Sequence, residues 1–290
     1  MGADMAGPSV AVRSWFDHQL AARALRTLLE VTEPEGVILL PVKGVLLART
    51  LYADVGERPI ADVDLRVRPP DLRRLARLCR ASGWALARGS KQWGTFEIEI
   101  DRTLIEFETS IGPPGVCGVT VAEMISRATR TSAGLGFPHL EPELHDHALV
   151  VCVNVFKDKI NDTVPWALGD LVRLAQQPAF DPERLAQLAA QASLCAAVWL
   201  VADWAASAGG SDGWREVRDR LGPTPPRPLY LRAYRALAER PRSSRLVLPL
   251  LARAASDRPA SRARALALGG AGVLSWAWVH ALRAARERME

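Results

Sequence analysis

Two aspartates separated by one residue are the part of the chain best suited to chemistry. Asp62 and Asp64 lie in an alternating apolar run with Ile60, Val63 and Leu65, and this alternation predicts a β-strand. Because successive strand side chains point to opposite faces, both carboxylates project from one face, with their Cα atoms about 7 Å apart. Such carboxylates repel each other unless a cation lies between them, and Mg²⁺ prefers oxygen ligands of this kind together with substrate phosphates. The pair therefore predicts a divalent-metal site.

Residues before this strand supply groups suited to phosphate. Lys43 and Gly44 follow the apolar run 37–42 and precede a helical pattern at 45–52. A turn of this kind, between a strand and a helix start, lets backbone N–H groups meet an anion. Arg58 carries a guanidinium that could either reach the same phosphates or serve the structure. The simplest chemistry uniting these parts is metal-assisted transfer of a nucleotidyl group from a nucleoside triphosphate.

The order and spacing of these residues resemble the polymerase-β-like nucleotidyltransferase superfamily. The likeness spans residues 20 to 180 and is greatest to a poorly characterised branch with the signature K-G, L-Y, R-P and D-x-D-L, matched here by Lys43-Gly44, Leu51-Tyr52, Arg58-Pro59 and Asp62-Val63-Asp64-Leu65. In the wider superfamily the turn is usually G-S or G-G, so Lys43 replaces a small residue. The resemblance implies Mg²⁺ or Mn²⁺ on the D-x-D carboxylates. It also implies an NTP co-substrate, with ATP the first expectation, whose phosphates contact Lys43, Gly44 and Arg58.

The clearest period-two alternation runs from residue 95 to 109, with a tight hairpin turn expected at Asp101-Arg102. One face then carries Phe96, Ile98, Ile100, Ile105 and Phe107, and the other carries Glu97, Glu99, Glu106 and Glu108. The superfamily places its third metal carboxylate on a strand at this point, usually an aspartate, and the related branch often has a histidine two residues later. The resemblance implies Glu106 as the third catalytic and metal-binding carboxylate, with Glu108 in the place of the histidine. This departure leaves the third ligand open between the two glutamates and allows for weakened activity.

Composition indicates an ordinary globular protein. The 290 residues are 49% hydrophobic and 24% charged, and the net charge is +5. Nearly all of the positive side chains are arginines. No basic run is dense enough to predict nucleic-acid binding. Four scattered cysteines without a C-x-x-C pair favour reduced thiols and a cytoplasmic location. The first residues lack the apolar core of a signal peptide, and the apolar stretch 265–282 is short for a membrane span.

The periodicity changes near residue 140, which predicts two domains. Residues 1–140 are expected to form an α/β (α+β) nucleotidyltransferase domain with a mixed sheet, and 141–290 an all-α domain. The expected strands are 37–42, 60–67 and the hairpin 95–109, and the expected helices are 14–31, 46–52, 72–81 and 121–128. Residues 110–142 otherwise read as irregular, and the C-terminal helices are expected at 143–160, 165–176, 181–207, 213–220, 228–239, 243–255 and 260–288.

Further polar residues give weaker signals. His145 and His147 are two apart, so on a helix they point to different faces and form a poor metal pair. We expect both histidines to be cap or surface residues. Lys91 is expected to be a loop residue, with an approach to the nucleotide as the alternative. Lys157 and Asn161 resemble polar residues of the family that face the cleft, and Asp170 resembles an aspartate on a later helix. The resemblance implies that Asp170 binds the acceptor or positions Lys157, although an N-cap or surface role fits it about equally well.

The leading hypothesis is a nucleotidyltransferase that moves a nucleoside monophosphate to a small-molecule, peptide or protein acceptor and releases pyrophosphate. A second hypothesis is a catalytically weak nucleotide-binding or partner-binding protein that retains the fold, favoured by the glutamate at the third position. A third is an RNA-binding module that uses the arginine-rich helices, for which affinity would fall with salt.

Overall fold

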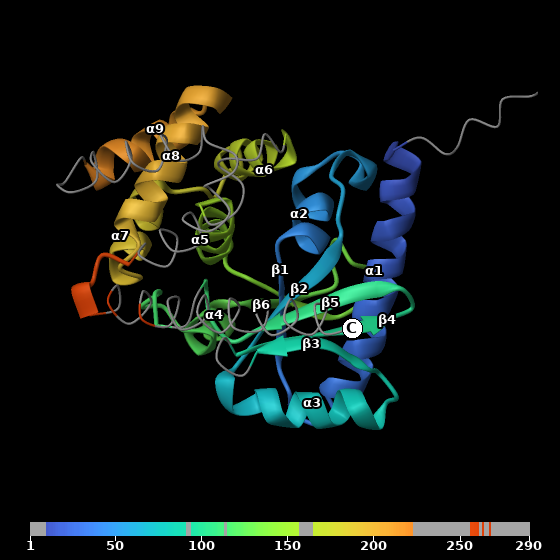
Figure 1. The fold of residues 1–290 in the computed structure, drawn as a ribbon. Coiled ribbons are helices and arrows are strands. Elements are labelled where there is room, and N and C mark those ends of the chain that lie inside the picture. Colours follow the sequence, from blue (N-terminus) through green and yellow to red (C-terminus); the bar gives the residue numbers. More distant parts are fainter. Residues whose placement is uncertain are drawn as a thin grey trace, which may run out of the picture.

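A five-stranded mixed sheet organises the N-terminal half (Figure 1). The computed structural model describes residues 10–90, 94–112, 115–156, 165–222, 256–260, 263 and 267. The strands are β1 (Leu39–Val42), β2 (Asp62–Val67), β3 (Leu86–Ser90), β4 (Thr95–Ile100) and β5 (Thr103–Glu108). Their order is β1-β2-β5-β4-β3, and only the β2–β5 pair is parallel.

The β4–β5 hairpin confirms the sequence prediction in its turn, its register and its faces. Asp101 and Arg102 have φ values of 49° and 68°, the positive pair that a two-residue type I′ turn requires. Phe96 lies opposite Phe107, and Glu97 lies opposite Glu106. The five apolar side chains assigned to one face are all buried, namely Phe96, Ile98, Ile100, Ile105 and Phe107.

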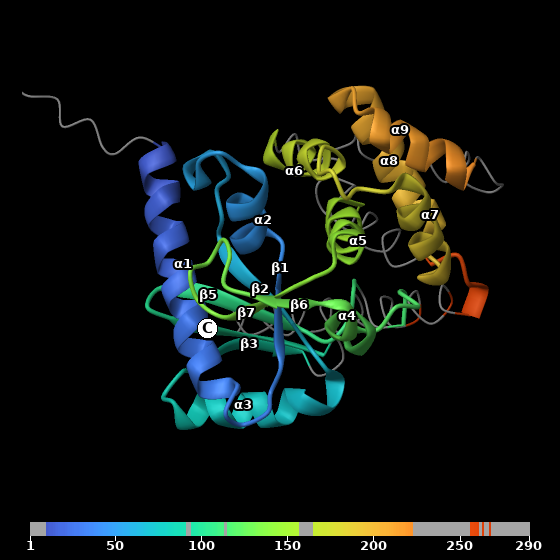
Figure 2. The same cartoon turned by 180° about the vertical axis from the view of Figure 1, so that it is seen from behind.

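Two helices cover the apolar face of the sheet (Figures 1 and 2). They are α1 (Val10–Thr32) and α3 (Leu72–Ala81), and α3 has the bounds that the sequence predicts. Leu25 and Leu28 of α1 and Leu75 of α3 share one buried cluster with the apolar side chains of β2, β4 and β5. The opposite face of β2 and β5 carries the acidic residues, because strand side chains alternate.

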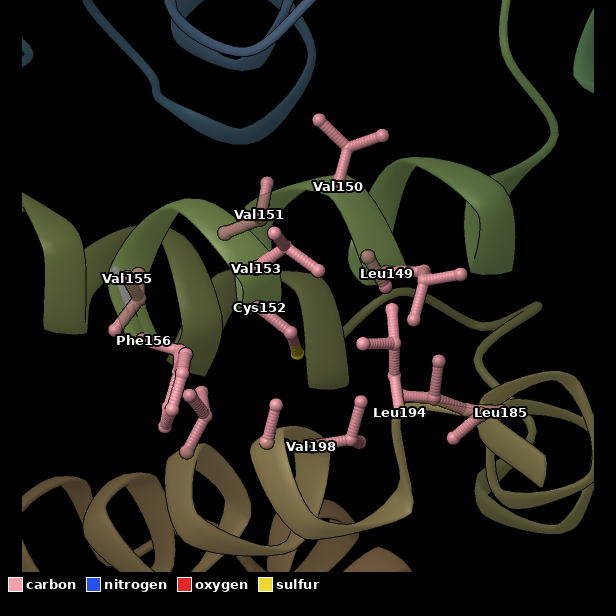
Figure 3. Packing of buried hydrophobic residues seen from close by; sticks show 14 of the residues in the cluster. Leu149, Val150, Val151, Cys152, Val153, Val155, Phe156, Leu185, Leu194 and Val198 are labelled. Carbon is pink, nitrogen blue, oxygen red and sulfur yellow. The ribbon is translucent and has the colours of Figure 1, made fainter. Parts of the chain in front are cut away.

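The C-terminal half is a group of helices around α5 (Leu144–Asn154). The others in the described part of the chain are α6 (Pro165–Ala175), α7 (Pro182–Gln191), α8 (Cys195–Gly209) and α9 (Asp212–Leu221). Residues 145–153 of α5 are all buried, as expected for a helix packed on every side. Figure 3 shows Leu149 and Cys152 of α5 directed toward Leu194 and Val198, while Val150 points the other way. Helix α5 is therefore the core of this half.

The two halves share this core. Leu40 and Val42 of β1 and Leu47 of α2 (Gly44–Leu51) belong to the same buried cluster as α5 to α9. The predicted fold class, a mixed-sheet α+β half followed by a helical region, is confirmed. The last strand among the described residues, β7 (His139–Glu141), ends beside the predicted boundary at residue 140. The division into two domains there stays a prediction.

Several predicted elements differ in the structure. The single helix expected at 181–207 is two helices, α7 and α8, because Ser193 adopts a φ of 58° between them. Helix α4 (Val121–Arg127) confirms the helix expected at 121–128, but the rest of 110–142, which was expected to be irregular, also contains a strand pair formed by β6 (Thr129–Thr131) and β7. Strand β3 was not predicted. The helices expected at 228–239 and 243–255, and almost all of 260–288, lie outside the described residues.

Within the described part of the chain, no helix combines the length and apolarity that crossing a bilayer requires.

Candidate functional site

Four carboxylates lie on the face of β2 and β5 that is turned away from α1 and α3. Asp64 of β2 is in register with Glu106 of the adjacent β5, and Asp62 is in register with Leu104. Neighbouring strands lie about 4.8 Å apart, so Asp62, Asp64 and Glu106 project from one face at adjoining positions. Glu108 follows on the same face beside Arg66. The structure thus brings together the three carboxylates singled out in the sequence.

Lys43 neutralises one of these carboxylates. Its Nζ lies 2.5 Å from Oδ1 of Asp64, and both side chains are largely buried. The ion pair is possible because Val42, at the end of β1, lies opposite Asp64 in the sheet. The lysine expected to contact phosphate is therefore within the acidic face itself.

The Lys43-Gly44 turn has an unusual backbone. Lys43 adopts φ 56° and ψ −131°. Residues with a side chain adopt this positive-φ conformation at a cost of about 1–3 kcal/mol, whereas glycine adopts it readily. Gly44 is required for space, because an added Cβ would lie 2.6 Å from Nη1 of Arg58 and 2.8 Å from Cγ2 of Ile60. The carbonyl of Lys43 accepts the N–H groups of Leu46 and Leu47 and so begins α2.

His147 of α5 holds this turn from the other half of the molecule. The N–H of Lys43 donates to Nε2 of His147 at 2.8 Å, so the ring has its proton on Nδ1. Burial, with the charges of Arg58 and Arg66, lowers the pKa of His147 to about 3. The expectation that His145 and His147 are cap or surface residues is wrong, since they are 3% and 6% exposed.

Arg58 lies in a buried ion pair with Asp170 of α6. Its Nε and Nη2 donate to the Asp170 carboxylate at 2.8 to 3.1 Å, and its guanidinium stacks over Trp166 at 4.7 Å. Tyr52 donates its hydroxyl to the same carboxylate at 2.7 Å. Of the two roles that the sequence left open for Arg58, this geometry favours the structural one, and its predicted phosphate contact stays a prediction. Asp170 is neither an N-cap nor a surface residue.

Arg66 is the site residue that sequence reasoning missed. It is 2% exposed and forms an ion pair with Glu108, while its Nε has no hydrogen-bond partner. The signal was present in the strand pattern, because Arg66 follows Asp64 by two residues and so shares its face. Lys91, Lys157 and Asn161 lie outside the described residues.

Asp62 shows the electrostatic cost of this crowding. Burial, and then the charge of Asp64, raise the pKa of Asp62 to about 6, against the opposing effect of Lys43. Burial is the larger cause and the charge of Asp64 adds to it, so a positive charge beside Asp62 would stabilise its ionised form. The local field therefore favours a bound cation.

The donor set fits a hard divalent cation in its chemistry. Carboxylate oxygens are the ligands that Mg²⁺ and Mn²⁺ prefer, and three of them adjoin on one face. Among the described residues, no three Asp, Glu, His or Cys side chains are already close enough to hold a metal ion. Asp64 is engaged by Lys43, so a full ligand set would require this lysine to move.

Comparison with known families decides the class. A family model described as "Uncharacterised nucleotidyltransferase" matches residues 15–208. The chain belongs to this nucleotidyltransferase family. The matched range spans the chain from before Lys43 to beyond Asp170, and it confirms the resemblance to a nucleotidyltransferase family.

More distant comparisons add little. A search of curated proteins finds no match. A crystal structure of ANT(2″)-Ia in complex with adenylyl-2″-tobramycin is similar at 15% identity and TM-score 0.40. The alignment covers 58% of the chain described here and 94% of the ANT(2″)-Ia chain. A solution structure of ANT(2″)-Ia is similar at 16% identity and TM-score 0.37, with 76% and 96% covered. Similarity at this level carries no argument about the substrate.

Proposed function

We propose that this nucleotidyltransferase is metal-dependent and transfers a nucleoside monophosphate, with ATP as its first expected donor, to a small-molecule, peptide or protein acceptor. The observation that carries the proposal is the register of Asp64 with Glu106, with Asp62 on the same face and the Lys43-Gly44 turn beside them. In the reaction an acceptor oxygen or nitrogen bonds to the α-phosphorus. The bond from that phosphorus to the bridging oxygen breaks, and pyrophosphate leaves.

Each residue of the acidic face has a role in the proposal. Asp62, Asp64 and Glu106 would hold the divalent cation, which would stabilise charge on the attacking and leaving oxygens. The Lys43 ammonium, once it leaves Asp64, would bind the departing phosphates together with the backbone at Gly44. Glu106 is the better candidate for the third ligand because it, and not Glu108, lies in register with Asp64.

The proposal is tested by pyrophosphate release. Each of the four NTPs is offered with Mg²⁺ or Mn²⁺ to acceptor panels of metabolites, aminoglycosides and peptides. We expect metal-dependent release that Asp62→Asn and Asp64→Asn abolish. The matched control is Glu99→Gln, since Glu99 lies on the same sheet face opposite Leu104 and is exposed. If the Asp62→Asn, Asp64→Asn double variant turns over as fast as the unmodified protein, these two aspartates are not catalytic.

A catalytically weak nucleotide-binding protein is the second candidate. Lys43 pairs with Asp64 and Arg66 pairs with Glu108, and a protein without a metal would need such ion pairs to offset the charge of the acidic face. Calorimetric binding of the NTP that is unaffected by chelating the metal, without turnover on any acceptor, would favour this reading.

A further inference from the structure

Strand β3 leaves one edge of the sheet open. It is the outermost strand next to β4, and within the described ranges no strand pairs with its other edge. An open edge presents backbone N–H and C=O groups in a row, which proteins use to bind an extended peptide as an added strand. The edge at β1, by contrast, packs against β7.

A groove of about 990 Å³ runs between this edge and helix α3. Its floor is apolar, with Leu72 and Ala76 on the helix side and Leu86 and Phe96 on the sheet side. Gly89 lies opposite Phe96 in the register, and an added Cβ there would meet the Cβ of Phe96 at 3.3 Å. A larger side chain at residue 89 would therefore press against Phe96 and reduce the room in the groove.

One wall of the groove is strongly basic. Arg73, Arg77 and Arg80 recur at helical spacing on α3, line the groove and are exposed. None of the three forms an ion pair within the described part of the chain, and no described acidic residue lines the groove. The neighbouring Arg74 differs, because it pairs with Glu35 and does not line the groove.

We propose that this groove binds an extended acidic peptide segment, which adds to the edge of β3 as a sixth strand. Every second side chain of such a segment faces α3, where a carboxylate meets the arginines and its methylene groups cover the apolar floor. Glutamate fits these demands better than aspartate because it is longer. Single-stranded nucleic acid fits less well, because its bases need exposed aromatic rings for stacking and Phe96 is 6% exposed. The surface is independent of nucleotidyl transfer.

The test uses a fluorescent ten-residue peptide of alternating threonine and glutamate and the full chain. Anisotropy should show salt-sensitive binding of this peptide, and no binding of the peptide with lysine in place of glutamate. N-methylation of alternate backbone amides should also abolish binding, because it removes hydrogen bonds to the strand edge. Failure of the glutamate peptide to bind at about 1 mM overturns the proposal. A ten-nucleotide RNA that binds more tightly than the peptide also overturns it.

Variants locate the site. Arg73→Glu and Arg77→Glu should each weaken peptide binding about tenfold or more, and Gly89→Leu should weaken it by filling the groove. Arg74→Glu is the matched control, with the same charge change on the same helix, and should leave the affinity within about twofold. Equal loss in Arg74→Glu and the groove variants would show a nonspecific charge effect and contradict the proposal.

Backbone amide shifts in the unmodified protein provide a readout that does not depend on variant folding. On adding the peptide, shifts concentrated in β3 and α3 support the site. Shifts elsewhere, without changes in these two elements, overturn it.

Discussion

At the scale of single residues, Lys43 joins the most features of the site. Its side chain pairs with Asp64, its N–H bonds to His147, and its carbonyl begins α2. These contacts hold a backbone conformation that glycine would adopt without strain. A charged residue at a glycine-like position is therefore retained by several partners at once, which agrees with strained residues clustering at functional sites.

Replacing Lys43 separates its backbone from its charge. Lys43→Gly and Lys43→Ala both remove the ammonium, but only glycine suits a φ of 56°. We expect Lys43→Gly to be more stable than Lys43→Ala by about 1–3 kcal/mol, and both to lose NTP affinity. Urea unfolding measures the first difference and calorimetry the second. If the two variants are equally stable, the turn is not strained.

Because the pKa of Asp62 is raised, replacing this aspartate should stabilise the folded protein by an amount that depends on pH. The folded-state pKa of about 6 exceeds the ordinary 3.8, so the stability that protonated Asp62 contributes is complete below about pH 4 and lost as the pH rises through 6. In chelator-containing buffer, Asp62→Asn should stabilise the protein by on the order of 1–3 kcal/mol at pH 8 and hardly at all at pH 4. Thermal melts at both pH values check this, with Glu99→Gln as control.

Asp64 should behave in the opposite way. The sequence alone suggests that removing either aspartate relieves repulsion and raises the melting temperature. The structure corrects this for Asp64, because Asp64→Asn would leave the buried ammonium of Lys43 without its ion-pair partner. We expect that variant to melt at a lower temperature than the unmodified protein at pH 8. A melting temperature at or above that of the unmodified protein would show that the ion pair contributes nothing.

At the scale of elements, strand β5 decides between the two candidate third ligands. Glu106 adjoins Asp64, whereas Glu108 pairs with Arg66. Glu106→Gln should lower metal-dependent turnover on the order of a hundredfold or more. Glu108→Gln should leave turnover within a few-fold but lower stability by about 1–3 kcal/mol, because Arg66 is buried. Parallel kinetics and urea unfolding compare them, and a reversed order of activity would move the ligand to Glu108.

Local sequence patterns predicted the elements whose own residues show clear periodicity or a clear start residue. The β4–β5 hairpin was found through its alternation, and α3 through its prolines and helical spacing. Strand β3 was missed because Leu86–Ser90 contains alanine and glycine and lacks alternation. The break between α7 and α8 was missed because Ser193 marks it and no glycine or proline does. Prediction from sequence fails where tertiary contacts impose a backbone conformation that the residue type rarely adopts.

At the scale of the whole molecule, polar contacts between residues far apart in the chain join the sheet half to the helices. Lys43 bonds to His147 across 104 positions of the chain, and Arg58 pairs with Asp170 across 112. The shared face of the two aspartates and the shared face of the two glutamates could be predicted from alternation, because their neighbours lie on adjacent strands. The role of Glu106 came from the family resemblance. His147 and Asp170 could be assigned no definite role, because no local pattern shows which distant group a side chain will meet.

The Arg58–Asp170 pair predicts cooperative unfolding of both halves. Asp170→Asn should cost about 3–5 kcal/mol by leaving a buried guanidinium without its counter-charge, whereas Arg58→Met with Asp170→Leu should cost much less than the sum of the single changes. A double-mutant cycle by urea unfolding measures the coupling. The exposed pair Arg26 and Glu30 is the control, with coupling of about 0.5 kcal/mol or less. A similarly small coupling for the buried pair would contradict its structural role.

The long separation of Lys43 from His147 also has a consequence for synthesis on the ribosome. Lys43 leaves the peptidyl-transferase centre 104 residues before its partner, which at ordinary elongation rates means about 5 to 20 s. During that interval β1 and α2 exist without the helices that cover Leu40, Val42 and Leu47. The nascent chain then presents an apolar surface and an unsupported turn, the state that holdase chaperones bind. Stalled nascent chains ending before α5 should therefore be captured by such chaperones, and those extending beyond α9 should not.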